Sequence, residues 1–514
     1  MRSQGSRWVA AAWLLLLPFA SAQAADGWSY RYKWVDVTAE KSSQEATQLA
    51  HDLYRLDVAM VKLLALNLGD SRPRVHVYSM SEGQLKQLLG DKNIGSEYVA
   101  SGFENDILIN DAAPFENRYY GAYYGYAGSV LMSEGALRYP FWFRSGVAEV
   151  FSASKMERKR VKLGGYLQWR AQVLLEGTFI PVRTLLRMHQ NDPQVKLTSS
   201  TRDAYDSECW FLVHLILIEG KYREQFGRYL YLMSQGQAEA DAFAESFPGV
   251  SYEDLDKMLK AAIAARKIGE LYVDIPEQQD AAKADRVSAA EVKARFARFG
   301  VLHGEALDYS LKLAQGALAA EPTNESALRA LALGQVRQGR YDEAFRTINR
   351  LAESHSLSAP AYADSAAVLV DVSKAVRQGE VSVGEEAPGL IRHAREDYAH
   401  AIELDEENLG YWSQLAELIG AQHDVEAAKA LKPKAEKVFY LHPRNSNLAR
   451  ALASMFGQTN DPEDAFKFAV AWQTNAIDDA GRDAAAAYLS RLRVGLERRD
   501  AASSAAAPAE NSGH

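Results

Sequence analysis

The C-terminal half of the chain contains a pattern that strongly restricts how it can pack. Residues 327–355, ALRALALGQVRQGRYDEAFRTINRLAESH, read as two helices joined by a turn at Gly339. A helix pair with one apolar face cannot bury that face alone, so similar pairs must stack on it. Further units end near Asn408 and Asn445, and DPEDAFKFAVAW begins another second helix. The pattern therefore predicts an α-solenoid over residues 301–497.

The helix pairs resemble the tetratricopeptide repeat family, whose units are about 34 residues long. The turn GRYDEA is the most specific match, and the resemblance covers roughly residues 304–492. The second unit departs from the family pattern because RQGEVSVGEEAPG lengthens its connection. The resemblance implies a concave groove that binds a protein or peptide partner.

The first 24 residues have the layout of a secretory signal peptide. Arg2 and Arg7 precede the apolar run VAAAWLLLLPFA, and a small-residue cleavage site ends at Ala24. This run is too short to span a bilayer, and no later segment is apolar enough for a transmembrane helix. The only cysteine, Cys209, lies far from the cleavage site, so there is no lipobox. We therefore expect an exported, periplasmic protein.

Composition limits the partners and the cross-links of the chain. A content of 47% hydrophobic residues is enough for a large core. With a single cysteine, no intrachain disulfide can form. Without residues 1–24 the chain carries 56 basic and 67 acidic residues, a net charge of −11. This bulk charge disfavours nucleic acid as a partner.

Residues 25–275 read as a separate domain of mixed structure. WSYRYKWVDV, RVHVYSM and DILIN are typical of strands, with the helical segments SQEATQLAHDLYRLDVAMVKLLAL and SEGQLKQLL between them. Strand signals then nearly stop, so we predict an α/β lobe at 25–115 and a helical lobe at 116–275. A charged, Ala-rich passage predicts a linker at 276–300, and low complexity predicts a disordered tail at 498–514. The fold class is α+β and mostly α.

The stretch GYAGSVLMSEGALRYPFWFRSGVAEVFSAS, residues 125–154, reads like part of an enzyme. Its P-x-W-x-x-x-G-x-A-E phrase resembles the gluzincin-type peptidase domains of the peptidase MA-like group. In that group H-E-x-x-H on one helix and E-G-x-A-E on the next complete a zinc site. The resemblance extends over roughly residues 27–268 and implies a zincin-like N-terminal domain. The residues that match the family pattern are Pro140, Trp142, Gly146, Ala148, Tyr205 and Trp210.

The residues that bind zinc in that family are missing from this chain. Matching by position places the two histidines at Tyr126 and Val130, the catalytic glutamate at Ala127 and the third ligand at Ser145. No H-E-x-x-H occurs elsewhere. Zinc would lack its usual ligands, and its bound water would lack a base. We therefore expect no metal and no cofactor.

Two interpretations of function remain. The first is a non-catalytic pseudoenzyme of the cell envelope, a scaffold or assembly factor that binds a protein or peptide through its repeats. The second is a hydrolase of altered, non-zinc mechanism that uses Glu149, His214 and nearby tyrosines such as Tyr126 as acid and base groups. Glu149 as an ion-paired residue and His214 as a core histidine are the structural alternative, so we favour the first interpretation.

Two further patterns have a functional and a structural interpretation. His393, Asp397 and His400 are spaced to share one helical face, where they could approach a metal, but no fourth ligand is apparent. The basic run KMERKRVK, residues 155–162, could contact an acidic partner or a phospholipid surface. Solvated polar positions are the structural interpretation of both patterns.

Overall fold

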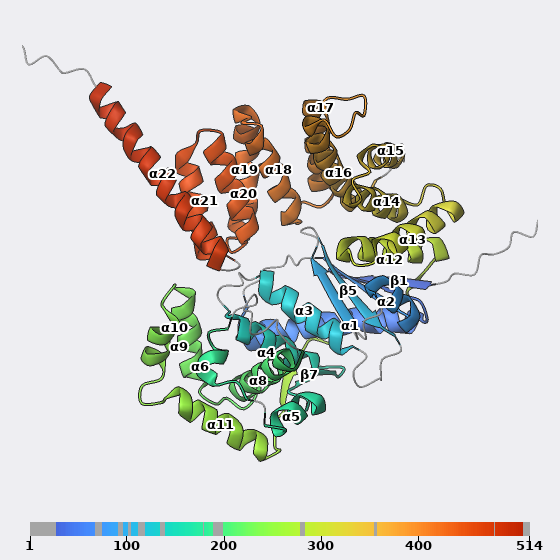
Figure 1. Cartoon of the computed structure of the whole chain (residues 1–514). Coiled ribbons are helices and arrows are strands. Elements are labelled where there is room, and N and C mark those ends of the chain that lie inside the picture. Colours follow the sequence, from blue (N-terminus) through green and yellow to red (C-terminus); the bar gives the residue numbers. More distant parts are fainter. Residues whose placement is uncertain are drawn as a thin grey trace, which may run out of the picture.

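The computed structural model describes residues 27–66, 74–90, 96–100, 104–111, 119–133, 139–177, 179–188, 199–277, 283–353, 357–476 and 479–506. The predicted signal peptide, residues 1–24, lies outside these ranges. Within them, no helix combines the length and the apolar character needed to cross a membrane. The chain is mostly helical, with one main sheet between a helical lobe and a helical array (Figure 1).

The main sheet has six strands in the order β4-β5-β3-β2-β1-β9. Its central strands β2, β3 and β5 are parallel, with Val35 opposite Val75 and Val75 opposite Asn105, and the other pairs are antiparallel. Parallel strands are usually covered on both faces, and the apolar runs of these strands fit that arrangement. The strands are β1 (Gly27–Tyr32), β2 (Val35–Ala39), β3 (Val75–Met80), β4 (Ser96–Ala100), β5 (Asn105–Asn110) and β9 (Asp285–Val287).

Helices cover both faces of this sheet. The helices α1 (Ser43–Leu64) and α3 (Tyr120–Ser133) contact the face that carries Val37, Val77 and Ile107. The helices α2 (Glu82–Leu89) and α12 (Ala289–His303) cover the opposite face, where Tyr78, Met80 and Leu108 pack with Phe296 and Phe299. Alternation of side chains along each strand produces this division.

The helical lobe is built around α8, whose Trp210 and Phe211 are fully buried. A small antiparallel sheet, β6-β7-β8, adds strands that the sequence analysis did not predict. The basic run at 155–162 forms its hairpin, with Val161 and Leu163 turned inward. The elements of the lobe are α4 (Phe141–Ser152), β6 (Lys155–Met156), β7 (Arg160–Leu163), α5 (Gln168–Leu175), α6 (Val182–Leu185), α8 (Ser199–Leu217), α9 (Arg223–Ser234), α10 (Glu239–Ser246), α11 (Tyr252–Ala264) and β8 (Leu271–Asp274).

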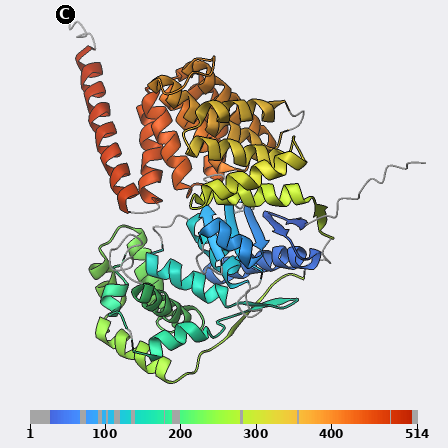
Figure 2. The ribbon, with the colours of Figure 1, turned by 45° about the vertical axis from the view of Figure 1, so that its right-hand side comes forward.

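The passage expected to be a linker, residues 276–300, is largely structured. Strand β9 pairs with β1, and α12 lies between the sheet and the helical array (Figure 2). The reason is the apolar stripe of Val292, Phe296 and Phe299, which the charged, Ala-rich composition conceals. Helix α12 is therefore a layer of the N-terminal domain and the first helix of the solenoid.

The array that follows is an α-solenoid of helix pairs. Its core is continuous through α14 to α22, with Tyr398, Tyr411 and Trp412 among the buried residues. The helices after α12 are α13 (Leu307–Ala320), α14 (Glu325–Arg337), α15 (Tyr341–Ala352), α16 (Ala359–Gln378), α17 (Ala387–Leu404), α18 (Leu409–Ala421), α19 (Val425–Leu441), α20 (Ser446–Gln458), α21 (Pro462–Thr474) and α22 (Asp479–Ala506).

The same cap and the same turn recur along the solenoid. The first helix of each pair begins after a residue whose side chain accepts a backbone N–H, as N-cap residues do. The turn inside each pair contains one residue with positive φ, a conformation that favours glycine and tolerates asparagine. The caps are Asn324, Ser358, Asn408 and Asn445, and the turn residues are Gly339, Gly379, His423 and Asn460.

The last helix is longer than the sequence analysis predicted. The tail expected to be disordered from residue 498 is helical as far as Ala506, and residues 507–514 lie outside the described ranges. Alanine has the highest helix propensity of the amino acids, so the Ala-rich segment that was taken for a tail extends α22.

Candidate functional site

Helix α3 carries three of the positions that the family resemblance assigns to the zinc site. The hydroxyl of Tyr126 donates to Asp57 Oδ1 of α1 at 3.0 Å and accepts from Trp34 Nε1 at 2.6 Å. Tyr126, Ala127 and Val130 are all buried in the core of the domain. Their side chains therefore contribute to packing and to a polar contact with α1.

The fourth position, Ser145 on α4, has a different set of neighbours. Its hydroxyl donates to Asp206 Oδ1 of α8 at 2.8 Å. Ser145 and Tyr126 thus bond to separate elements. Across the described ranges, no group of three or more His, Cys, Asp or Glu side chains is arranged to hold a metal ion.

Both carboxylate oxygens of Glu149 accept hydrogen bonds from neighbouring side chains. Its Oε2 accepts from the Tyr120 hydroxyl at 2.6 Å, and its Oε1 accepts from Arg170 Nη2 at 2.5 Å. Burial raises the pKa of Glu149, and Arg170 opposes that rise. Both carboxylate oxygens have partners and the side chain is fully buried, so Glu149 has no direct access to a substrate.

Arg170 of α5 joins this carboxylate to a second one. Its Nη2 also lies 3.7 Å from Asp206 Oδ2, and Arg202 Nε donates to the same oxygen at 2.8 Å. The result is a closed polar cluster from four helices, α3, α4, α5 and α8. Arg170 could not be predicted from the sequence because its pairing depends on tertiary packing, whereas the i, i+4 spacing of Arg202 and Asp206 indicates an ion pair on one helix.

His214 is a buried histidine on α8. Its Nε2 donates to the carbonyl oxygens of Gly164, at 3.3 Å, and Gly269, at 3.1 Å. Burial lowers the pKa of His214, which favours the neutral ring. Within the described part of the chain, no hydrogen bond or ion pair joins His214 to Glu149. The two residues that the hydrolase interpretation pairs therefore bond to different partners.

The residues of the family pattern explain how α4 meets α8. A Cβ on Gly146 would lie 2.3 Å from the carbonyl oxygen of Cys209, so only glycine allows this close approach. The Cys209 side chain is itself buried, and burial raises the pKa of its thiol. The other pattern residues pack around this crossing or begin α4: Pro140, Trp142, Ala148, Tyr205 and Trp210.

A second buried carboxyl group on α8 was not anticipated from the sequence. Glu208 Oε2 accepts from the backbone N–H of Ile180 at 2.8 Å, whereas Oε1 has no hydrogen-bond partner among the described residues. Burial raises the pKa of Glu208 to about 8, with a smaller contribution from Asp256. Glu208 is therefore mostly protonated at neutral pH.

The two further patterns are occupied by local ion pairs. The His393 ring nitrogens lie 3.1 Å from Glu385 and 3.1 Å from Glu396, and His400 lies 3.2 Å from Glu403. In the basic run 155–162, neighbouring carboxylates pair with Arg158, Lys159, Arg160 and Lys162. These contacts fit the structural interpretation of both patterns.

We call the surface formed by the first helices of the pairs, including the fifth position after each cap, the inner face of the solenoid. One part of this face lies against the N-terminal domain, and another part is exposed. Arg329, five positions after the cap Asn324, points toward Glu104 at the edge of the sheet. Arg450 has the same position after the cap Asn445, and it is exposed and pairs with Glu417 of α18 at 2.6 Å. The inner face therefore approaches the sheet at α14 and presents the polar side chains of Glu417 on α18 and Arg450 on α20.

No family model and no curated protein matches this chain. Among solved structures, it is similar to YrrB, described as a TPR protein with an unusual peptide-binding site, at 14% identity and a TM-score of 0.29. That match covers 38% of this chain and 91% of YrrB. It is also similar to TTC0263, a thermophilic TPR protein in Thermus thermophilus, at 19% identity and a TM-score of 0.31, over 39% of this chain and 99% of TTC0263. The repeat architecture rests on the recurring caps and turns of the chain itself.

Proposed function

We propose that the chain is an exported, periplasmic pseudoenzyme that binds a protein or peptide partner through the inner face of α18 and α20. Its N-terminal domain would be a peptidase-like fold without a metal site, and the protein would act as a scaffold or assembly factor. The proposal is supported by the contrast between a buried carboxylate in the N-terminal domain and exposed polar side chains on the solenoid. Glu149 is buried with both oxygens bonded, whereas Asn447 and Arg450 are exposed on the solenoid.

The catalytic part of the proposal is tested with purified protein. Elemental analysis should find no stoichiometric zinc, and no hydrolase activity should depend on Glu149 or His214. The variants Glu149→Ala and His214→Ala are compared with the wild type on peptide and peptidoglycan substrates. A tightly held metal, or an activity that either change abolishes, would overturn the pseudoenzyme assignment.

The binding part is tested by site-specific photocrosslinking in cells. A crosslinking amino acid at Asn447 lies on the exposed inner face, and the same amino acid at Lys429 of α19 provides an exposed control on a second helix. We expect a defined partner band at position 447 that is absent at position 429. Equal labelling at both positions, or no band at 447, contradicts this binding surface.

A further inference from the structure

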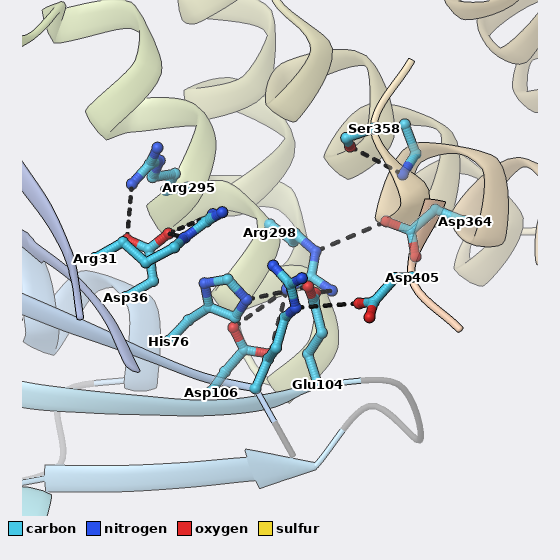
Figure 3. A network of polar contacts seen from close by, with 12 residues as sticks. Arg31, Asp36, His76, Glu104, Asp106, Arg295, Arg298, Ser358, Asp364 and Asp405 are labelled. Atoms are coloured by element: carbon cyan, nitrogen blue, oxygen red, sulfur yellow. Dashed lines mark hydrogen bonds and ion pairs between the residues drawn. The ribbon is translucent and has the colours of Figure 1, made fainter. Parts of the chain in front are cut away.

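Charged side chains gather on the face of the sheet that lies under α12 (Figure 3). Asp36, His76 and Asp106 occupy neighbouring strands in register, since Asp36 is opposite His76 and His76 is opposite Asp106. Glu104 immediately precedes β5. Side chains at one register position of adjacent strands point to the same face. The sheet therefore presents three carboxylates and one imidazole to the solenoid.

Helix α12 supplies two arginines to this face. Arg298 Nη2 lies 2.7 Å from Glu104 Oε2, and its Nη1 lies 3.2 Å from Asp106 Oδ1. Arg295 Nη1 lies 3.7 Å from Asp36 Oδ1. Arginine suits such multidentate contacts with buried carboxylates because its guanidinium carries several fixed donors.

The solenoid helices beyond α12 extend the network. Arg329 of α14 binds Asp364 of α16 at 2.7 Å and lies 3.9 Å from Glu104. Arg298 Nε lies 3.7 Å from the same Asp364 oxygen. At the rim, Arg74 and Asp405 are 3.1 Å apart, which ties the start of β3 to the end of α17. The network thus spans the sheet and three pairs of the solenoid.

His76 is the histidine of this network, and histidine is the side chain whose ordinary pKa, about 6.5, lies closest to neutrality. Its Nε2 lies 3.0 Å from Glu104 Oε1, and four-fifths of its side chain is buried. Burial lowers the pKa of His76, but Glu104, then Asp36 and Asp106, outweigh burial and raise the pKa above its ordinary value. The ring also stacks against Tyr78, which donates to Asp106.

The charge balance depends on the proton of His76. Three sheet carboxylates face Arg298, protonated His76 and Arg295, which also pairs with Glu291 of α12 at 2.7 Å, while Arg329 pairs with Asp364. Arg31 also contacts Asp36, but its side chain is 60% exposed, so water screens its charge. Loss of the His76 proton removes one of these cations, so Glu104 and the neighbouring carboxylates lose part of the positive charge that compensates them.

We propose that His76 is a pH-sensitive clasp between the sheet and the solenoid, in which the protonated ring holds Glu104 and its loss of charge loosens α12 and α14. Because the ring binds its proton more tightly in the folded chain, its stabilising contribution is complete below about pH 6.5. That contribution disappears as the pH rises through the folded-state pKa. The clasp is independent of whether the solenoid binds a peptide.

Hydrogen–deuterium exchange of the full chain tests the clasp between pH 6 and pH 8.5, with rates corrected for intrinsic exchange. Wild-type amides of α12 and α14 should lose protection as the pH rises. His76→Gln should show the low protection at every pH, and His400→Gln, an exposed histidine change on α17, should behave as the wild type. Unchanged wild-type protection, or a pH dependence that survives in His76→Gln, overturns the proposal.

A second variant keeps the test decisive if His76→Gln does not fold. Asp36→Asn leaves the Glu104 contact in place but removes a carboxylate that raises the pKa of His76, so the midpoint of the pH dependence should move to lower pH. In the wild type, amides of α20, whose side chains take no part in the network, serve as an internal reference and should lack this transition. An unmoved midpoint in Asp36→Asn, or the same transition in α20, rules the clasp out.

Discussion

Replacing Arg298 with methionine is the sharpest test of how the N-terminal sheet and the solenoid are held together. Methionine keeps much of the length and apolar contact of the side chain but removes the charge that Glu104 and Asp106 share. Those two carboxylates have side-chain exposures of only 3% and 0%. Removing one partner of a buried ion pair costs about 3–5 kcal/mol, because the remaining charge is left uncompensated. We therefore expect Arg298→Met to lower the free energy of unfolding by about that amount.

Arg31→Met is the matched control for this change. Arg31 belongs to the same network through Asp36, but exposed ion pairs contribute only about 0–1 kcal/mol. Urea unfolding followed by circular dichroism and tryptophan fluorescence measures both variants, with each transition fitted separately because a chain of several regions need not unfold in two states. If Arg298→Met is no more destabilising than Arg31→Met, the reasoning is refuted.

A rescue variant separates lost charge pairing from lost packing. Combining Arg298→Met with Glu104→Gln and Asp106→Asn removes the charge on both sides of the contact. Replacing a whole buried ionic group with neutral residues is often close to neutral, so most of the lost stability should return. A triple variant as unstable as Arg298→Met alone would place the effect in packing instead.

Three further changes test α3 and the helical lobe. Gly146→Ala should destabilise the chain by about 1–3 kcal/mol because its Cβ meets the backbone of Cys209. Gly128→Ala, on α3 with open space around it, should be stabilising by about 0.4–1 kcal/mol, and equal thermal shifts for the two would contradict this. Glu208 has a raised pKa of about 8, so its effect on stability is absent below about pH 4.5 and becomes increasingly unfavourable up to pH 8. Glu208→Gln should flatten that slope in denaturation measured across this pH range, with a gain of at most about 5 kcal/mol.

The solenoid could be predicted from the sequence because its helices and turns are marked by residues that are close together in the chain. Gly339 marks the turn of one pair through its conformational freedom, which a reader of the sequence can recognise. His423 and Asn460 adopt the same left-handed conformation without being glycine, so the boundaries of their units were harder to predict. The lengthened connection before α17 obscured another boundary.

The parts that the sequence did not predict depend on contacts between distant residues. The stripe of Val292 and Phe296 in α12 lies within an Ala-rich, charged passage, and only the sheet beneath it explains why it is buried. Glu149 meets Arg170 across 21 positions, and Glu104 meets Arg298 across 194. Such pairings cannot be predicted from the composition or the periodicity of the sequence.

The shared position of α12 has a consequence for the order in which the chain folds. Strand β9 and helix α12 complete a sheet that begins at Gly27, and Gly27 pairs with Val287 across 260 positions. Contacts of such long range slow folding, and the face with Tyr78 and Leu108 stays open until they form. A chain cut near residue 276 would keep that apolar face and an unpaired β1 edge, a combination that favours aggregation. Strand β9 and helix α12 complete the N-terminal domain, and α12 is also the first helix of the solenoid. The N-terminal domain and the solenoid are therefore expected to fold as one cooperative unit.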